Sequence, residues 1–329
     1  MSKVTMQDIA EHLAISKNSV SQALRNKNGV SQRTRELVHE AAEKLGYAYK
    51  EKNDEGRLNL KFLLVATEFA LSQTSFFGEI VSSIKETVEK NGNHLVVEAI
   101  YPEQVEQLIL PNVFKEEKWA GIFILSHLSN EYSQKLIESN VPCVLVDHHH
   151  PHLKTDAVLT QNNDGAFLAV DYLLGRGHKQ IGFIGNVEFS PSYAERLIGY
   201  EKALESQGII PNKEHIFCDI KEDQAQLFER LTRLKTMPTA WFCVNSGLAF
   251  ILNTFLQSQG FEIPGDSAIL CFDNTEFTRL AQPQISSIAT DLDYMGEKAV
   301  AVMEQRILEP DSAYVQVSIL PELVLRAST

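Results

Sequence analysis

The strongest constraint on the fold is an alternation, from residue 60 onward, of short apolar runs with helical stretches of about 10–15 residues. The runs are LKFLLVA from Leu60, HLVVEAI from His94, AGIFIL from Ala120, CVLV from Cys143, IGFIG from Ile181, AWFCV from Ala240 and AILCF from Ala268. Continuous apolar runs are typical of strands buried on both faces, as in parallel sheets covered by helices. A second series begins near Asn162, so the pattern predicts two doubly wound α/β lobes.

The ends of the predicted strands indicate where such a domain would bind a ligand. Ligands of open α/β sheets bind outside the carboxyl ends of the strands. Two such lobes facing each other can close on a ligand by a hinge motion. The pattern therefore favours a small-molecule binding cleft.

Residues 1–48 are predicted to form three short helices. Ser16 and Ser31 are placed to cap the second and third helices, and Thr5 the first, because each hydroxyl precedes a run with helical periodicity. Only Ala14 and Ile15 separate the first two helices, which requires a tight turn. Two short helices and a third that completes the core form the helix-turn-helix plan. Periodicity alone leaves a helical bundle with a solvated polar face as the alternative.

In a helix-turn-helix the start of the second helix contacts base edges in the major groove. Lys can bond guanine acceptors, and Asn or Gln can bond adenine. Hydroxyl groups at helix starts suit phosphate contacts made together with backbone N–H groups. The candidate DNA-binding residues are Thr5, Ser16, Lys17, Asn18, Ser21, Gln22, Arg25, Ser31 and Thr34.

The charge distribution fits a DNA-binding head on an acidic body. Residues 1–50 hold eight Lys and Arg against five Asp and Glu, a net charge of +3. The other 279 residues hold 22 basic and 38 acidic side chains, a net charge of −16. A basic module that binds a polyanion, joined to an acidic sensor, would show this asymmetry.

The head closely resembles that of the lactose-repressor (LacI/GalR) family. VTMQDIAEHLAISKNSVSQAL and GVSQRTRELVHEAAEKLGY carry the resemblance, which continues through Gly177-His178, Arg196 to Tyr200, FCVN, Phe272-Asp273 and PELVLR. It implies an all-α headpiece (1–48), a linker or hinge (49–59) and a periplasmic-binding-protein-like effector and dimerisation domain (60–329). The implied N-lobe is about 60–161 plus 292–320, and the implied C-lobe 162–291 plus 321–329.

The resemblance also implies which residues bind the effector: Phe76, Phe77, Asp147, Ser192, Arg196, Asn245 and Asp273. Taken singly, each is equally well explained as a helix cap or surface ion pair. The chain departs from the family's usual residues, with Ala14 for Gly, Ser19 for Thr, Gln22 for Arg, Ser246 for an acidic residue and Gln161 for Asp. Gln22 therefore predicts a different operator sequence, and Ser246 and Gln161 leave the ligand open.

In the family the linker forms a hinge helix that wedges a leucine into the minor groove and kinks the operator. Here the segment is KEKNDEGR, and Gly56 stands about where the leucine would be. We expect a flexible linker and a smaller operator kink, which a DNA-bending assay would check.

Other features indicate no further chemistry. The start lacks an apolar signal core and no run of 18 apolar residues occurs, so we expect a cytoplasmic protein without a membrane span. The four cysteines form no CxxC pair, and three of them lie in apolar runs. His148, His149, His150 and His152 have no recognisable metal-ligand spacing. With no phosphate-binding loop and no GxSxG motif, we predict no metal, no cofactor and no enzyme activity.

The sequence thus predicts a homodimeric regulator, a repressor, that reads a pseudo-palindromic operator under the control of a small molecule. A sugar or sugar derivative is the favoured effector; a purine-like or protein corepressor is the alternative. A pure solute-binding protein and an α/β enzyme acting on sugars are the competing classes. The head and the lack of a signal peptide argue against the first, and the lack of a recognisable nucleophile, phosphate loop or metal-ligand set argues against the second.

Overall fold

The computed structural model describes residues 6–24, 30–45, 59–73, 75–116, 118–125 and 128–329. The chain divides into two compact units, Met1–Asn59 and Leu60–Thr329. Thr5, Arg25 and the linker residues 49–58, Gly56 among them, lie outside the described residues.

The first unit is a three-helix domain of α1 (Met6–Leu13), α2 (Lys17–Leu24) and α3 (Gln32–Lys44). The predicted caps at Ser16 and Ser31 are confirmed: their hydroxyls accept the backbone N–H of Ser19 at 3.0 Å and of Thr34 at 3.2 Å. Its core consists of Ile9, Ala10, Val20, Ala23, Val38, Ala41 and Ala42. The turn between α1 and α2 gives Ala14 a φ of +52°, a left-handed conformation that costs any residue with a Cβ.

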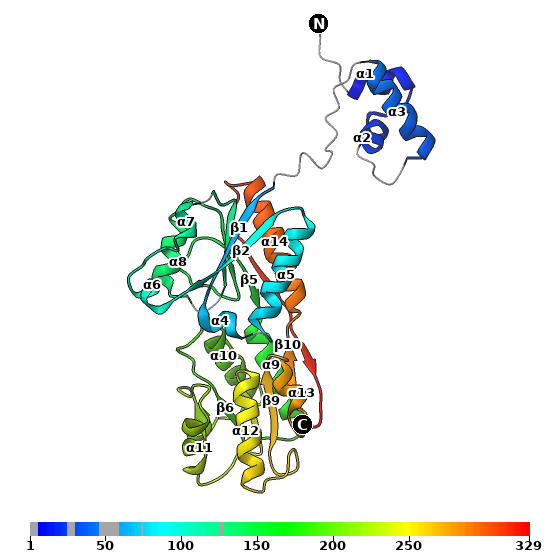
Figure 1. Ribbon diagram of the computed structural model, residues 1–329. Helices are drawn as coiled ribbons and strands as arrows, with labels where there is room; N and C mark the ends of the chain where they lie inside the picture. Colours follow the sequence, from blue (N-terminus) through cyan, green and yellow to red (C-terminus); the bar gives the residue numbers. More distant parts are fainter. Residues whose placement is uncertain (1–5, 25–29, 46–58, 74, 117, 126–127) are drawn as a thin grey trace. The chain divides into compact units, whose positions relative to one another are not determined.

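The second unit contains two six-stranded sheets, which confirms the predicted two-lobed α/β fold (Figure 1). The first sheet is parallel throughout, in the order β11-β5-β4-β3-β1-β2. Its strands are β1 (Lys61–Thr67), β2 (His94–Ile100), β3 (Gly121–Leu125), β4 (Cys143–Val146), β5 (Asp156–Thr160) and β11 (Gln316–Ile319). β3, β4 and β5 are buried along their whole length, as the unbroken apolar runs of β3 and β4 predict.

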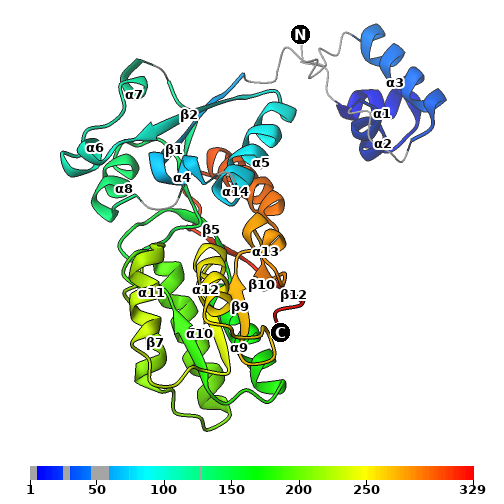
Figure 2. The ribbon, with the colours of Figure 1, turned by 60° about the horizontal axis from the view of Figure 1, so that its bottom comes forward.

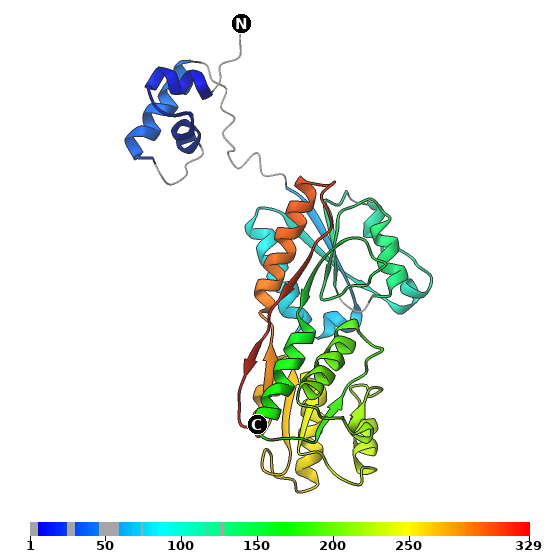
Figure 3. The ribbon, with the colours of Figure 1, turned by 180° about the vertical axis from the view of Figure 1, so that it is seen from behind.

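The second sheet has the order β12-β10-β9-β8-β6-β7. Its strands are β6 (Ile181–Ile184), β7 (Ile216–Phe217), β8 (Ala240–Cys243), β9 (Ala268–Phe272), β10 (Ser286–Ala289) and β12 (Glu322–Val324). All pairs are parallel except β10 with β12. This antiparallel edge exists because the chain returns from β11 of the first sheet to the second, as Figure 3 shows in red.

Helices cover both sheets. In the first lobe they are α4 (Glu68–Ser72), α5 (Phe77–Lys90), α6 (Pro102–Glu106), α7 (Val113–Glu116), α8 (Asn130–Ile137) and α14 (Leu292–Leu308). In the second they are α9 (Asn162–Gly175), α10 (Pro191–Ser206), the 3-10 turn η2 (Lys213–His215), α11 (Gln224–Thr232), α12 (Ser246–Ser258) and α13 (Glu276–Leu280). α5 packs beside α14 (Figure 1) and α9 beside α10 (Figure 2).

Close approach of α9 and α10 depends on Gly199. A Cβ at this position would collide with the main-chain oxygen of Asn163 on α9. The contact matters for the site because α10 carries Ser192 and Arg196 at its amino-terminal end and α9 carries Asn162, whose side chain contacts Arg196.

The two lobes are joined by three chain crossings, β5 to α9, β10 to α14 and β11 to β12. The first two crossings touch, since the hydroxyls of Thr160 and Thr290 lie 3.2 Å apart. Three crossings at one edge leave the lobes free to rotate about that edge, which is the arrangement of a hinged cleft. Within the part of the chain that the structure describes, no helix is long and apolar enough to span a membrane.

Candidate functional site

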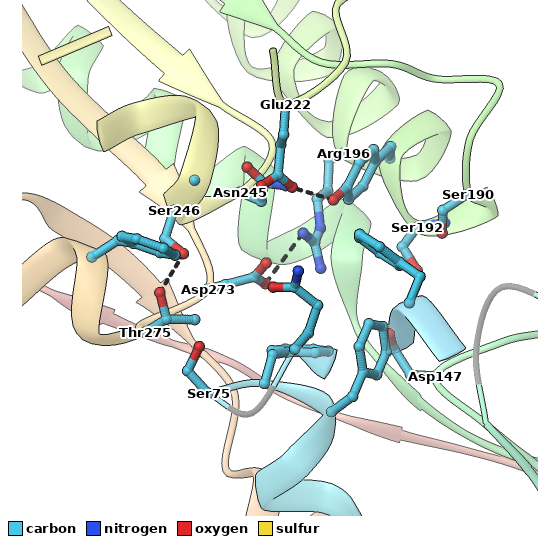
Figure 4. A pocket seen from close by; sticks show the side chains of 17 residues that line it. Ser75, Asp147, Ser190, Ser192, Arg196, Glu222, Asn245, Ser246, Asp273 and Thr275 are labelled. Carbon is cyan, nitrogen blue, oxygen red and sulfur yellow. Dashed lines mark hydrogen bonds and ion pairs between the residues drawn. The ribbon is translucent and has the colours of Figure 1, made fainter. Parts of the chain in front are cut away.

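One pocket collects all seven candidate effector residues. It has about 600 Å³ of space between its atoms when the open solvent at its mouth is counted, and it draws residues from both lobes. Phe76 and Phe77 come from the start of α5 and Asp147 from the end of β4; Ser192 and Arg196 belong to α10, and Asn245 and Asp273 follow β8 and β9. Figure 4 labels the five polar residues of this set, which lie around a common space. The strand-end rule accounts for this, because β4, β8 and β9 each deliver a polar residue to the cleft.

Asp147 and Asp273 share an unusual backbone conformation. Their φ angles are +53° and +65°, a region that Asp and Asn enter more readily than other residues with a side chain. Each residue turns the chain sharply after its strand, β4 for Asp147 and β9 for Asp273. The strain is consistent with a site in which side-chain direction is fixed before the ligand arrives.

Arg196 is held mainly by the protein itself. Its side chain is only 2% exposed. Nε donates to Oδ1 of Asn162 at 2.9 Å and Nη1 to the carbonyl of Val244 at 2.6 Å. Nη1 also lies 3.3 Å from Oδ1 of Asp273, and the guanidinium carbon lies 3.7 Å from the centre of the Phe272 ring. These contacts with the described residues leave Nη2 of Arg196 to meet a ligand.

Asn245 organises a second group of polar side chains. Its Oδ1 accepts the backbone N–H of Leu248 at 2.9 Å, which caps α12 and fixes the direction of the amide. Nδ2 therefore points the other way and donates to Oη of Tyr193 at 2.7 Å and to the carboxylate of Glu222. Glu222 comes from the loop between β7 and α11, and the Asn245 side chain holds it against the pocket.

Burial raises the pKa of every carboxyl group in the pocket. The pKa of Asp147 rises to about 7, because burial outweighs the attraction of Arg196 and is reinforced by repulsion from Asp273. The pKa of Glu222 rises through burial, against the hydrogen bond from Asn245. The pKa of Asp273 also rises through burial, although Arg196 is its neighbour. Oδ1 of Asp147 is buried and has no hydrogen-bond partner among the described residues.

Several pocket residues were not predicted from the sequence. They are Phe69, Gln73, Ser75, Ser190, Tyr193, Glu222, Ser246, Gly247, Thr275 and Phe277. Tyr193 lies one residue from Ser192, so the same helix start could have suggested it. Ser246 stands out in the sequence only as a departure from the family, yet its hydroxyl lies 2.5 Å from that of Thr275 in the pocket. Glu222 follows no apolar run, and the sequence offers no indication of its place.

The histidine cluster after β4 has separate roles. His148 is buried, and its pKa falls to about 4, mainly because burial disfavours the cation. His149 forms an ion pair with Glu195 of α10, while the ring centres of His150 and His152 lie 5.2 Å apart. No group of three or more potential ligands is placed to hold a metal ion among the residues that the structure describes.

The candidate DNA-binding residues within the described range lie on α2 and α3 or at their caps. Ser16 and Lys17 are exposed at the start of α2, Gln22 is half-exposed on the same helix, and Ser31 and Thr34 begin α3. Asn18 and Ser21 belong to α2. Val20 and Ala23 face the core, so α2 has its buried and polar residues on different sides.

A helix-turn-helix together with a two-lobed α/β domain that has a cleft between its lobes defines the class of DNA-binding transcription regulators. Residues 5–49 match the family described as bacterial regulatory proteins, lacI family, and residues 170–329 match the periplasmic binding protein-like domain. The chain belongs to the lacI family of bacterial regulatory proteins.

Individual relatives and solved structures match this chain over nearly its whole length. The repressor CytR of Escherichia coli (strain K12) is 28% identical, with 99% of this chain and 96% of CytR covered. A structure of the regulator CelR with cellobiose has a TM-score of 0.72 at 23% identity, covering 99% of this chain and all of CelR. The lac repressor dimer bound to operator and the anti-inducer ONPF has a TM-score of 0.71 at 24% identity, covering 100% and 99%.

Proposed function

We propose that this protein is a cytoplasmic transcriptional repressor whose affinity for its operator is set by a small molecule bound between the lobes. The observation that carries the proposal is the single pocket that gathers all seven candidate residues from both lobes. A ligand touching both lobes binds the closed and open arrangements unequally, and only such a difference shifts an equilibrium. No catalytic role is proposed, in keeping with the naming of CytR as a repressor.

The favoured effector is a sugar or a sugar derivative. Polar groups suited to hydroxyls alternate with the rings of Phe69, Phe76, Phe77 and Phe277, against which the apolar faces of a sugar can pack. The neighbouring fold of CelR was solved with cellobiose, which supports this choice. A purine-like corepressor is the alternative, because the same rings could stack on a base.

In this proposal the DNA contacts are made by the start of α2. Lys17, Asn18 and Gln22 would read base edges, while Ser16, Ser21, Ser31 and Thr34, with Thr5 and Arg25, would contact the backbone. The lac repressor structure with operator is a dimer, and two headpieces on a two-fold axis would read a pseudo-palindrome.

The proposed homodimer has a candidate surface in the second unit. β2 is the edge strand of its sheet and exposes Val96 and Val97, and α13 exposes Leu280 at 69%. An open strand edge offers unpaired backbone groups, and exposed apolar side chains offer contact area, so each can contribute to pairing with a second copy. We expect Leu280→Glu to lower the dimer fraction in analytical ultracentrifugation, with the substitution Leu308→Glu, at another exposed leucine, as the control.

The central test is selection of bound duplexes from a random library by the full-length protein, followed by titration of the selected duplex with candidate effectors. Recovery of a pseudo-palindrome of about 16–20 base pairs, with affinity that changes when a sugar is added, is the expected result. Response to a purine instead would favour the alternative. No enrichment even at low salt, where phosphate contacts are strongest, would count against the proposal.

A further inference from the structure

The pocket contains more negative than positive side chains. Among the described lining residues, three are carboxylic acids, Asp147, Glu222 and Asp273, and one is a base, Arg196. Arg196 is already paired with Asp273 and bonded to the carbonyl of Val244. Within the described part of the chain, neither Asp147 nor Glu222 forms an ion pair. When ionised, the side chains that line the pocket therefore carry a net negative charge.

The position of Glu222 is specifically supported. Asn245 can donate to the Glu222 carboxylate only because its own oxygen is taken by the cap of α12. Gly247 provides the space, since a Cβ at this position would collide with the Glu222 side chain. Two neighbours thus direct this acidic group toward the cleft, where its pKa rises through burial and through repulsion from Asp273.

A neutral ligand would not relieve this arrangement. Asp147 is buried and its Oδ1 has no hydrogen-bond partner among the described residues, which costs free energy whether the carboxyl group is charged or protonated. Glu222 is exposed and accepts a hydrogen bond from Asn245, so it contributes a negative charge that no described cation pairs with. Hydroxyl groups can donate to them, but an ammonium group makes shorter and stronger charge-assisted hydrogen bonds. An anion would face repulsion from Asp147 and Glu222, and only Nη2 of Arg196 would remain to attract it.

We propose that the effector carries a protonated amine, as an amino sugar or aminocyclitol does, and that Glu222 with Asp147 and Asp273 recognises this group. The inference rests on the proposed effector role of the pocket and narrows it to one ligand class. The phenyl rings then pack on the apolar face of the same ligand, and Phe76 and Tyr193 add favourable cation–π geometry wherever the amine lies over a ring.

The test compares ligands that differ only in charge. Binding of glucose and galactose to the full-length protein is measured by calorimetry beside glucosamine, galactosamine and their isomers with the amine on each other carbon, and beside glucose 6-phosphate as the anion. We expect at least one amine to bind about tenfold or more tightly than its parent sugar, and the phosphate to bind more weakly than either.

Two variants assign the effect to the carboxylate. Glu222→Gln keeps the shape of the side chain and its hydrogen bond from Asn245, and should reduce the advantage of the amine to about twofold or less. Asp147→Asn is the second pocket variant, in case Glu222→Gln unfolds. Glu201→Gln, at an exposed position of α10, changes the net charge equally and should leave the advantage intact. Thermal unfolding of each variant shows that it is folded.

Three outcomes would overturn the inference: a parent sugar that binds as tightly as every amine, an amine advantage that survives in both pocket variants, or no amine binding up to about 10 mM. A parent sugar that binds as tightly as every amine would leave the proposed effector role of the pocket intact. Conversely, an amine that binds as expected but never changes the affinity for the selected operator would refute the proposed function and leave the ligand class intact.

Discussion

Nε2 of His149 lies 3.2 Å from Oε1 of Glu195 and thereby joins the loop after β4 in one lobe to α10 in the other. Glu195 continues the connection, accepting Nδ2 of Asn162 at 2.9 Å, and Asn162 in turn accepts Nε of Arg196. A second contact between the lobes is made by the rings of Phe69 and Phe189, 6.0 Å apart and edge to face. An ionic and an aromatic contact thus help to hold the cleft closed.

The ionic contact should make lobe closure depend on pH. The hydrogen bond to Glu195 raises the pKa of His149 above 6.5. Protonated His149 therefore stabilises the folded protein fully below pH 6.5, and this stabilisation is lost as the pH rises through the raised pKa. Burial opposes ionisation of Glu195, but the hydrogen bonds from His149 and Asn162 outweigh it and lower its pKa below 4.5. That contribution is present above 4.5 and is lost as the pH falls through the lowered value.

We therefore expect His149→Gln to destabilise the protein most at pH values between the lowered pKa of Glu195 and the raised pKa of His149. The loss should be about 0.5–1 kcal/mol, seen as a small decrease in Tm that vanishes at higher pH. His152→Gln, at an exposed position of the same loop, is the control and should leave the profile unchanged. A Tm difference for His149→Gln that is the same at every pH would show that the ion pair contributes nothing.

A buried ion pair stabilises the first lobe independently of the site. Nε and Nη2 of Arg306 donate to the two carboxylate oxygens of Asp156 at 2.7 and 3.0 Å, and both side chains are buried. The remaining donors of Arg306 bond the carbonyls of Pro310, Ser312 and Ala313. This network fixes the turn that leads from α14 into β11.

Removal of one partner leaves the other charge buried and unpaired, so Arg306→Met should lower the free energy of unfolding by about 3–5 kcal/mol. Chemical denaturation of the variant measures this loss. Arg233→Met breaks the exposed pair with Glu229 on α11 and should cost less than about 0.5 kcal/mol. Equal losses in the two variants would contradict the assignment.

The sequence predicted the strands that coincide with apolar runs. β1, β3, β4, β6, β8 and β9 are such strands, whereas β2, in the run HLVVEAI, is an edge strand in which only Ile100 is buried and the expectation of burial on both faces was wrong. β5 was missed because Asp156 and Thr160 at its two ends leave only three apolar residues between them, and the burial of Asp156 depends on Arg306, which is 150 residues away. β7, β10, β11 and β12 are short strands defined by their neighbours in the sheet. Local periodicity carries no information about such pairings.

The residues of the candidate site also fall into those that the sequence predicted and those that only the fold brings together. Asp147, Asn245 and Asp273 were predicted from the family resemblance, and their places after apolar runs agree with the rule that ligands bind at the carboxyl ends of strands. Glu222 is in the cleft because Asn245 donates to it and Gly247 leaves room for it. These are tertiary relationships between a loop and a helix start, and no spacing in the sequence expresses them.

Ala14 offers a test of strain in the headpiece turn. Its φ of +52° is unfavourable for alanine, whereas glycine adopts it freely. We expect Ala14→Gly to stabilise the headpiece by up to about 1 kcal/mol, measured by hydrogen exchange of the buried α1 and α3 amides in the full chain. Glu40→Gly, at an exposed position inside α3, should destabilise it by about 1 kcal/mol. A loss of stability in both variants would show that the turn is unstrained.

Gln22 provides the sharpest test of how α2 reads DNA. If its amide bonds adenine in each half-site, Gln22→Arg should exchange that preference for guanine, because a guanidinium matches the O6 and N7 acceptors of guanine. We expect the discrimination at that one position to change by about 1–3 kcal/mol, while the other positions of the selected site keep their preferences. Sequencing of duplexes selected by both proteins measures the change. Gln7→Arg adds the same charge to the exposed face of α1 and should raise affinity for all sequences alike through phosphate attraction. If Gln22→Arg produces only that uniform gain, α2 does not contact bases through this residue.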